Sequence, residues 1–237
     1  MTLDDPDYVQ RQYVSESGLA ARKAVYMEIT GPDARNIVFD AVAAVHPRDV
    51  LEVGCGEGEL AERVQRELQI SVVAIDQSER MVELTRARGV DARVGNVDHL
   101  PLDDRTFDVA IAAWMLYHAP DVDRAVAELA RVLRAGGRLV ATTNATDHLR
   151  EMFDVAGVGP YNMSFRAENG AEVLGRHFAS VETITAHGTV TFRDAERIRS
   201  YLRSSARLRE SADRVPELKE PLVVRRRPVV FVAEKAA

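Results

Sequence analysis

Strands and helices alternate along the central part of the sequence. Short apolar runs that are typical of buried strands are each followed by a segment with the apolar period of a helix. The expected strands are residues 49–53, 71–76, 91–94, 107–114 and 138–144, and the expected helices are residues 58–68, 78–89 and 121–137. Because strands linked by helices pair in parallel with right-handed crossovers, this order predicts an open α/β sheet with helices on both faces.

The expected ends of the helices carry ordinary capping signals. Ser78 can cap the helix over residues 78–89, and Gly89 can end it. Gly136 and Gly137 are expected to close the helix over residues 121–137.

The flanks of this alternating region are less regular. Residues 7–45 indicate two helices, and "HLREMFDVAG" and residues 193–210 each indicate one more. "ASVETITAHGTVTF" indicates one or two strands, and residues 228–235 a last strand. No linker divides the chain, so we expect a single domain over residues 1–237. Its parts are a helical N-terminal cap (1–45), a core (46–144) and a C-terminal part (145–237).

Composition narrows the class of protein. Of the 237 residues, 46% are hydrophobic, enough for a sizeable core, and no apolar run approaches the roughly 20 residues of a membrane-spanning helix. The polar, acidic start "MTLDDPDYVQRQY" does not resemble a secretory signal. With one cysteine, Cys55, no internal disulfide can form, which favours a reducing cytoplasm. A net charge of -6 argues against nucleic acid as the main partner.

The stretch "VLEVGCGEGEL" (50–60) points to a ligand site. Its glycines, Gly54, Gly56 and Gly58, lie between the first strand and the first helix of the core. Ligands of open α/β sheets bind at such turns, where a bare backbone allows close approach and helix-start amides donate hydrogen bonds. Asp76 ends the second strand, and a carboxylate there can accept both hydroxyls of a ribose. The alternative is a tight turn that has no ligand.

The spacing of the glycines separates two classes of ligand. A dinucleotide fingerprint places its third glycine at position 59, where this chain has Glu59. Glu52 and Glu57 add to the acidity around the loop, which is unfavourable for a diphosphate. A cationic ligand without phosphate suits the loop better.

Four stretches in order resemble the motifs of class I S-adenosylmethionine-dependent methyltransferases, most closely the bacterial small-molecule branch called the methyltransferase-11 group. They are "VLEVGCGEGEL", "AIDQSERMVELTRARG", "VGNVDHLPLDDRTFDVAIAAWMLYHAPD" and "ELARVLRAGGRLVATTN". The likeness is strong over residues 48–144 and looser in the flanks. It implies a Rossmann-like sheet of seven strands, mostly parallel, with residues 228–235 as the antiparallel last strand beside the fifth.

The resemblance also implies contacts with S-adenosylmethionine, which would leave as S-adenosylhomocysteine. Gly54, Cys55, Gly56 and Gly58 would line the methionine moiety, with Glu52 orienting the loop. Because methyl transfer of this kind needs no covalent intermediate, Cys55 is not expected to be a nucleophile.

Further cofactor contacts would follow the second and third strands. Asp76 would hold the ribose, and Gln77 and Met81 would flank the sugar and the adenine. Asn96 stands where the family usually carries Asp and keeps an acceptor oxygen for the adenine amino group, and the amide of Val97 would meet a ring nitrogen.

Residues at the end of the fourth strand would serve the methionine end and the acceptor. The carbonyl of Ala112 or Ala113 would receive the methionine ammonium, next to Trp114. His118 is our preferred general base, with Tyr117 beside it, since imidazole titrates near neutral pH. Lining of the pocket or capping of the next helix are the alternatives for His118, and core packing is the alternative for Trp114.

Outlying residues complete the expected site. Tyr13 and Arg22 of the N-terminal segment would cover the cofactor and meet its carboxylate, or else pack a helix and face solvent. His148, Glu168 and Asn169 could border the acceptor, although an uninvolved surface histidine and a helix start are the simpler explanations. No metal site is expected.

We therefore expect an enzyme that transfers a methyl group to oxygen or nitrogen of a small molecule. The rival hypotheses are an NAD(P)-binding Rossmann oxidoreductase and a non-catalytic S-adenosylmethionine-binding scaffold. An RNA methyltransferase is a weaker alternative. It is suggested by the seven arginines against four acids over residues 193–214 and by "RRR" at 225–227.

Overall fold

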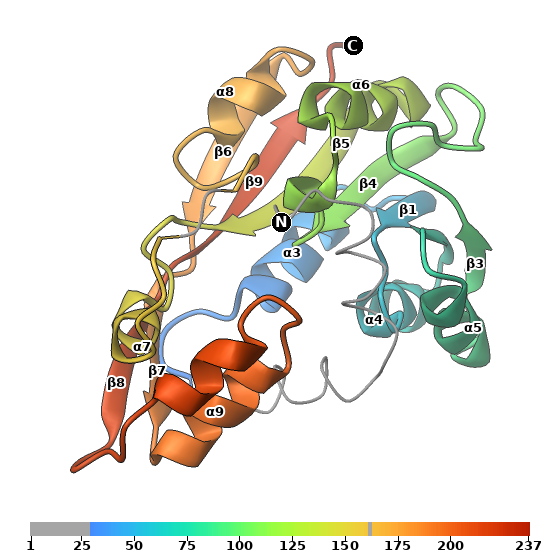
Figure 1. Cartoon of the computed structure of the whole chain (residues 1–237). Helices are drawn as coiled ribbons and strands as arrows, with labels where there is room; N and C mark the ends of the chain where they lie inside the picture. Colours follow the sequence, from blue (N-terminus) through green and yellow to red (C-terminus); the bar gives the residue numbers. More distant parts are fainter. Residues whose placement is uncertain (1–28, 161–162) are drawn as a thin grey trace.

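The computed structural model describes residues 29–160 and 163–237. Seven strands form the main sheet, in the order β3-β2-β1-β4-β5-β9-β6 (Figure 1). Their bounds, in the same order, are Asp91–Val94, Ser71–Asp76, Asp49–Val53, Phe107–Ala113, Leu133–Asn144, Pro228–Glu234 and Ser180–Thr185. Strands β1 to β5 pair in parallel, whereas β9 pairs antiparallel with both β5 and β6. The expected sheet is thus confirmed, including the last strand inserted beside the fifth.

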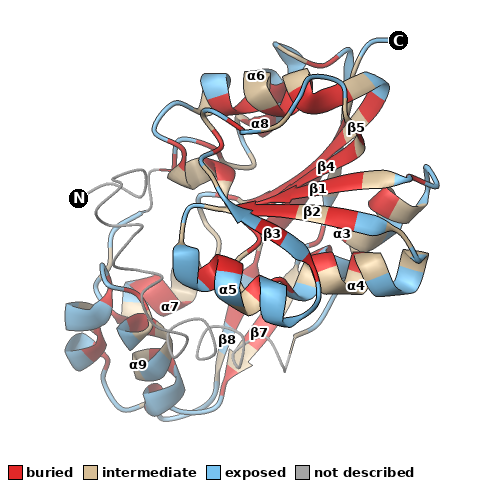
Figure 2. Cartoon of the chain, turned by 90° about the vertical axis from the view of Figure 1, so that its right-hand side faces the viewer, coloured by how far each residue is buried: buried red, intermediate tan, exposed pale blue. Residues whose placement is uncertain are grey.

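Helices cover both faces of this sheet (Figure 2). On one face lie α6 (Val122–Val132) and α8 (Gly170–Gly175), and on the other α3 (Ala34–Ala43), α4 (Glu59–Leu68) and α5 (Glu79–Ala87). Because successive strand residues point to opposite faces, Leu51 joins the first layer and Val50 the second.

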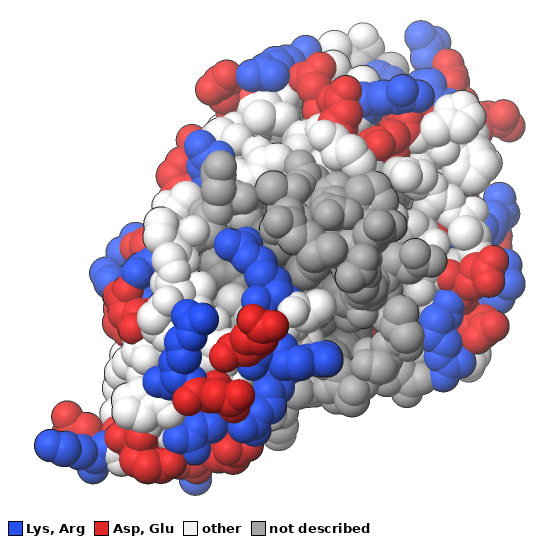
Figure 3. Space-filling view, in the orientation of Figure 1, with Lys and Arg blue, Asp and Glu red and all other residues white. Residues whose placement is uncertain are grey.

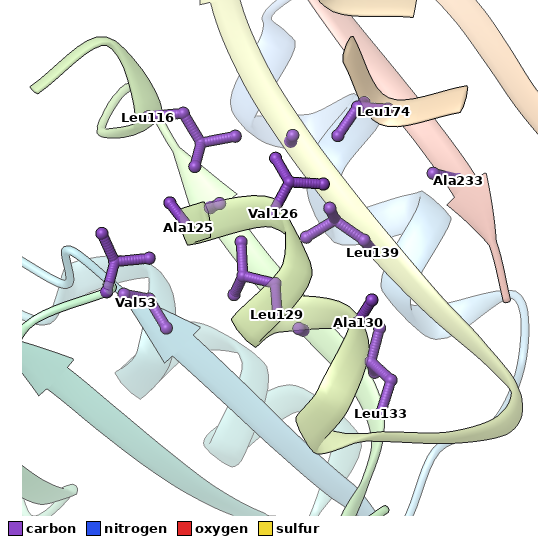
Figure 4. Packing of buried hydrophobic residues seen from close by; sticks show 14 of the residues in the cluster. Val53, Leu116, Ala125, Val126, Leu129, Ala130, Leu133, Leu139, Leu174 and Ala233 are labelled. Carbon is purple, nitrogen blue, oxygen red and sulfur yellow. The ribbon is translucent and has the colours of Figure 1, made fainter. Parts of the chain in front are cut away.

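The packing of α6 shows how an apolar stripe fixes a helix to the sheet. Val126 and Leu129 of the helix lie against Leu139 of β5 and Val53 of β1 (Figure 4). All four side chains are almost fully buried. Removal of that much apolar surface from water stabilises the fold by about 1.5–3 kcal/mol for each large side chain.

A smaller unit lies beside the carboxyl edge of the sheet. It has a two-stranded antiparallel sheet of β7 (Gly188–Phe192) and β8 (Leu222–Arg226). Three helical segments pack with it around a core of their own, namely α7 (Arg150–Val155), α9 (Ala195–Arg203) and the 3-10 helix η3 (Arg209–Arg214). The strand β8 was not expected from the sequence.

Two boundaries differ from the sequence-based prediction. The third core helix, α6, ends at Val132 and is not closed by Gly136 and Gly137. Leu133 instead adopts an extended backbone and pairs with Phe107, so that β5 begins at Leu133 and not at residue 138. The predicted cap of α5 is confirmed, since the hydroxyl of Ser78 accepts a hydrogen bond from the amide of Met81. None of the described helices is both long and apolar enough to cross a membrane.

Candidate functional site

A cavity of about 650 Å³ opens at the carboxyl edge of the parallel strands. The residues that end or follow β1 to β5 line it. The starts of α3 and α4, Tyr201 of α9 and Arg226 of β8 also belong to the wall. The cavity therefore spans the point between β1 and β4 where the strand order reverses, the usual ligand position in open α/β sheets. Its volume is within the range of small-molecule and cofactor sites.

The three glycines of the loop after β1 have different surroundings. All three have positive φ, of 73° at Gly54, 53° at Gly56 and 75° at Gly58. A Cβ on Gly56 would meet no atom within 4 Å, and Gly56 lines the cavity. A Cβ on Gly54, which also lines the cavity, would come within 2.6 Å of Met115.

Gly58 has a packing role and is not among the residues that line the cavity. A Cβ there would lie 2.7 Å from the side chain of Thr85 on α5. The prediction that all three glycines face the ligand is therefore wrong for Gly58, since its missing side chain lets the start of α4 approach α5.

Asp76 lies at the end of β2 with both oxygens directed at backbone amides. One oxygen accepts a hydrogen bond from Gly56 at 2.9 Å and the other from Ser78 at 3.0 Å. Burial raises the pKa of this carboxyl, against the effect of these bonds and of the amide of Gln77. The aspartate and Gln77 both line the cavity, as expected.

Glu52 is a buried acid in the cavity wall. It is only 3% exposed, and its Oε2 atom has no hydrogen-bond partner among the residues that the structure describes. Burial raises the pKa of Glu52 to about 8, and the charge of Asp76 adds to this, whereas the amide of Ala61 opposes it. An unsatisfied buried oxygen is costly, so the wall is suited to a ligand that brings a donor or a positive charge.

Cys55 is a buried residue of the same loop. It lines the cavity, but its side chain is buried against Thr85, with 3.5 Å between the Sγ and Oγ1 atoms. Burial and the proximity of Glu52 raise the pKa of this thiol to about 12. Since the thiolate is the nucleophilic form, the geometry agrees with the expectation that Cys55 is no nucleophile.

The loop after β3 supplies the next part of the wall. Asn96 and Val97 line the cavity, and the side-chain oxygen of Asn96 accepts a hydrogen bond from the amide of Asp98. Met81, expected to flank the sugar and the adenine, is instead buried at 1% exposure and is not among the lining residues. Met81 lies in the first turns of α5, where its side chain packs inward.

The end of β4 brings several predicted residues together. Ala113, Trp114, Tyr117 and His118 all line the cavity, whereas Ala112 is fully buried. Trp114 has a φ of 54°, an uncommon conformation for a bulky residue that is found at functional sites. The rings of Tyr117 and His118 lie edge to face with their centroids 4.5 Å apart.

His148 also lies in the cavity wall. Its Nδ1 atom accepts a hydrogen bond from the backbone amide of Arg227 at 2.9 Å. Burial, together with the charge of Arg226, lowers the pKa of His148 to about 3. Its ring is therefore neutral at physiological pH.

The sequence analysis missed several lining residues, among them Asn144, Tyr201 and Arg226. Asn144 ends β5, and its side-chain oxygen accepts a hydrogen bond from the indole of Trp114 at 3.4 Å. Tyr201 of α9 and Arg226 of β8 reach the cavity from the smaller unit. The position of Asn144 at a strand end could have revealed it, whereas Tyr201 and Arg226 carry no local signal.

Glu168 and Asn169 lie outside the lining of the cavity. Glu168 accepts hydrogen bonds from the amide and the hydroxyl of Thr146. Asn169 bonds to the backbone of Ser164 and Arg166. These contacts hold the loops after β5 and before α8. Tyr13 and Arg22 lie outside the described residues.

Several arginines of the C-terminal part are paired with acids. Arg199 and Arg203 of α9 both contact Glu196, and acidic residues are interspersed with basic ones over this part of the surface (Figure 3). Arg225 pairs with Glu151, and Arg226 is buried. Among residues 29–160 and 163–237, no group of His, Cys, Asp and Glu is arranged to hold a metal ion.

Known proteins resemble the chain in sequence. A family model described as "Methyltransferase domain" matches residues 51–141. An uncharacterised methyltransferase of Mycobacterium tuberculosis is 36% identical over 132 residues, which are 53% of this chain and 52% of that protein. The 27-O-demethylrifamycin SV methyltransferase of Amycolatopsis mediterranei is 40% identical over 98 residues, 38% of this chain and 36% of that protein. The chain thus spans about half or less of the length of these relatives.

Solved structures share the fold. The YcgJ protein of Bacillus subtilis matches with a TM-score of 0.65 and 15% identity, over 86% of this chain and 98% of that one. A possible histamine N-methyltransferase of Thermotoga maritima matches with a TM-score of 0.55 and 23% identity, over 85% and 89% of the two chains. With the matched family model and the order of the strands, residues 51–141 form a class I S-adenosylmethionine-dependent methyltransferase domain.

Proposed function

We propose that the chain transfers a methyl group from S-adenosylmethionine to an oxygen or nitrogen atom of a small-molecule acceptor. The observation that carries this proposal is that Gly54, Gly56, Glu52 and Asp76 line one cavity at the reversal of the strand order. The matched domain and the named relatives support the same reaction class.

The residues present suit this cofactor. The open space beside Gly56 leaves room for a group against the bare backbone. Glu52 has a buried oxygen without a partner in the described part of the chain, and it would face the ammonium or sulfonium charge. Asp76 would accept bonds from the ribose, and Asn96 and Val97 would contact the adenine.

The acidity of the wall separates this proposal from dinucleotide binding. Glu52, Glu57, Glu59 and Asp76 all line the cavity. A diphosphate would meet four carboxyl groups there, whereas a cationic cofactor is attracted to them. This observation disfavours an NAD-dependent oxidoreductase.

When bound, S-adenosylmethionine supplies an electrophilic methyl group on a sulfonium whose leaving group is a neutral thioether. The protein then has to align the acceptor and exclude water, and alignment can lower a barrier by about 7–11 kcal/mol. Trp114 and Tyr117 would provide aromatic walls that favour a dispersed positive charge. His118 would take a proton from an acceptor that binds protonated, and such a base contributes about 10²–10⁴ in rate.

We propose that the methyl acceptor is a small molecule and not an RNA. The ion pairs of α9 and the pairing of Arg225 with Glu151 leave little reason to invoke an RNA backbone. A cytoplasmic location is proposed on the single cysteine, which is buried as a thiol.

Thermal shift with S-adenosylhomocysteine and with NAD tests the cofactor. We expect stabilisation by S-adenosylhomocysteine alone, and stabilisation by NAD alone would reject the proposal. Incubation of cell extracts with methyl-labelled S-adenosylmethionine, followed by mass spectrometry, would then identify the acceptor. Binding of the cofactor without any labelled product would favour a non-catalytic scaffold.

A further inference from the structure

The orientation of His148 leaves one ring nitrogen for the cavity. Because Nδ1 accepts the amide hydrogen of Arg227, this atom carries no proton, and the neutral ring must carry its proton on Nε2. The Nε2 atom has no hydrogen-bond partner among the described residues, and the side chain lines the cavity. His148 therefore presents a donor to a bound molecule, and Nε2 cannot act as a base in this tautomer.

Other donors gather at the same end of the cavity. Arg226 is only 4% exposed and lines the wall, with one guanidinium nitrogen donating to the carbonyl of Thr30. Its charge is close enough to act on the pKa of His148. The oxygen of Asn144 is used by Trp114, so its amide hydrogens are a third source of donors.

One described acid at this end, Asp33, is already engaged. Asp33 lines the cavity, but its carboxylate is paired with the guanidinium of Arg35 at 2.8 Å. Burial raises the pKa of Asp33, but the hydrogen bonds and charge of Arg35, with a smaller contribution from the charge of Arg226, outweigh it and lower this pKa. This end therefore combines a fixed N–H donor with a buried cation, unlike the acidic end beside Glu52.

We propose that His148 and Arg226 bind an anionic oxygen of the methyl acceptor, so that the acceptor is a molecule bearing a carboxylate or a similar oxyanion. This inference rests on the proposed function and names the acceptor class of that site. Hydrogen bonds from a neutral donor and from a guanidinium to one oxyanion are strong and directional. His148 would thus position the acceptor and leave proton removal to His118.

The chain carries its own reporter for this test. Trp114 is the single tryptophan of the sequence and lines the cavity. The protein is saturated with S-adenosylhomocysteine, and the fluorescence of Trp114 is followed during titration with benzoate and with benzamide. These two molecules share a shape and differ in charge. We expect benzoate to bind at least about tenfold more tightly than benzamide. Equal affinity, or no binding of benzoate, would overturn the inference.

Variants of His148 distinguish its role as a hydrogen-bond donor from a role in packing. His148→Phe should weaken the binding of benzoate by about tenfold, and His148→Gln, which can return an N–H group, should restore most of it. The control is His177→Phe, the same change at a half-buried histidine that pairs with Asp123 outside the cavity, and it should behave as the wild type. Unchanged affinity for benzoate in His148→Phe would count against the role of His148.

The tautomer of His148 can be measured on the wild-type protein, and His148→Gln serves to assign its signal. Two-bond ¹H–¹⁵N correlation spectra should show one histidine, absent in His148→Gln, as the neutral Nε2–H form at pH 6 to 8. An Nδ1–H form or a charged ring would contradict the proposal. Affinity for S-adenosylhomocysteine is measured in parallel. Intact cofactor binding without benzoate preference rejects this inference alone, whereas absent cofactor binding rejects the proposed function.

Discussion

One oxygen of the Asp76 carboxylate accepts the amide hydrogen of Gly56 at 2.9 Å, which joins the end of β2 to the glycine loop after β1. The other oxygen accepts the amide of Ser78, which caps α5. The aspartate thereby fixes both loops that we propose to hold the cofactor. Buried charged groups with such bonds are well positioned before a ligand arrives.

The glycines of the loop should respond differently to substitution. Gly56→Ala should lower the affinity for S-adenosylhomocysteine by at least about tenfold, because the methyl group projects where the ligand would lie. Its free energy of unfolding should fall only by the strain of a positive φ, about 1–2 kcal/mol. Gly58→Ala adds a clash with Thr85 and should destabilise the fold more. Urea unfolding and calorimetry measure the two effects, and an inverted order would contradict the assignment of Gly58 to packing.

The free energy of unfolding should depend on pH through Glu52. Below pH 4.5 the carboxyl is protonated in both states, so its contribution to stability is fully present there. Between pH 4.5 and about 8 the unfolded chain ionises at Glu52 while the folded chain does not, so the free energy of unfolding falls by about 1.4 kcal/mol per pH unit. Glu52→Gln removes this loss.

Unfolding of the ligand-free protein in urea tests this. We expect Glu52→Gln to gain about 2–4 kcal/mol relative to the wild type between pH 4.5 and pH 8. A difference between variant and wild type that stays constant over this range would show that Glu52 does not titrate as described.

The affinity for S-adenosylmethionine should also depend on pH. A cationic ligand beside Glu52 favours the ionised carboxyl, so binding releases a proton and affinity should rise from pH 6 to 8. Calorimetry in buffers with different ionisation enthalpies measures the protons released. The slope should disappear in Glu52→Gln, and its persistence there would assign the proton to another group.

Glu168 should contribute to stability and not to cofactor binding. Glu168→Gln removes a charge that the amide and hydroxyl of Thr146 bond to, and should cost about 0.5–1.5 kcal/mol of stability. Affinity for S-adenosylhomocysteine should stay within about twofold of the wild type. A large loss of affinity with unchanged stability would show instead that Glu168 takes part in cofactor binding.

The parallel core could be predicted from the sequence because each strand is a short apolar run that ends at a polar or glycine signal. The bounds of β1, β2 and β3 agree with the predicted ranges, and Asp76 lies where the pattern put it. Local signals also identified the loop after β1. These elements depend mostly on residues near one another in the chain.

The sequence-based predictions are wrong where contacts between residues far apart in the chain determine the structure. The helical period of "ARVLRAGG" continues through Leu133, but pairing with Phe107 draws Leu133 into the sheet. The three glycines look alike in sequence, and only Thr85 of another helix distinguishes Gly58.

The acceptor end of the cavity could not be assembled from the sequence for the same reason. His148 meets Arg227 from 79 positions away, and Arg227 directly follows β8, a strand that has no clear local pattern. Such contacts depend on the packing of the smaller unit against the sheet.

Calorimetric titration of Asp76→Ala with S-adenosylhomocysteine tests the central claim most directly. Loss of a carboxylate that accepts from the ribose and orders the loop should weaken binding by about 10- to 100-fold, while Asp76→Asn, which keeps one oxygen, should fall between the variant and the wild type. Affinity in Asp76→Ala equal to that of the wild type would contradict the proposed cofactor site.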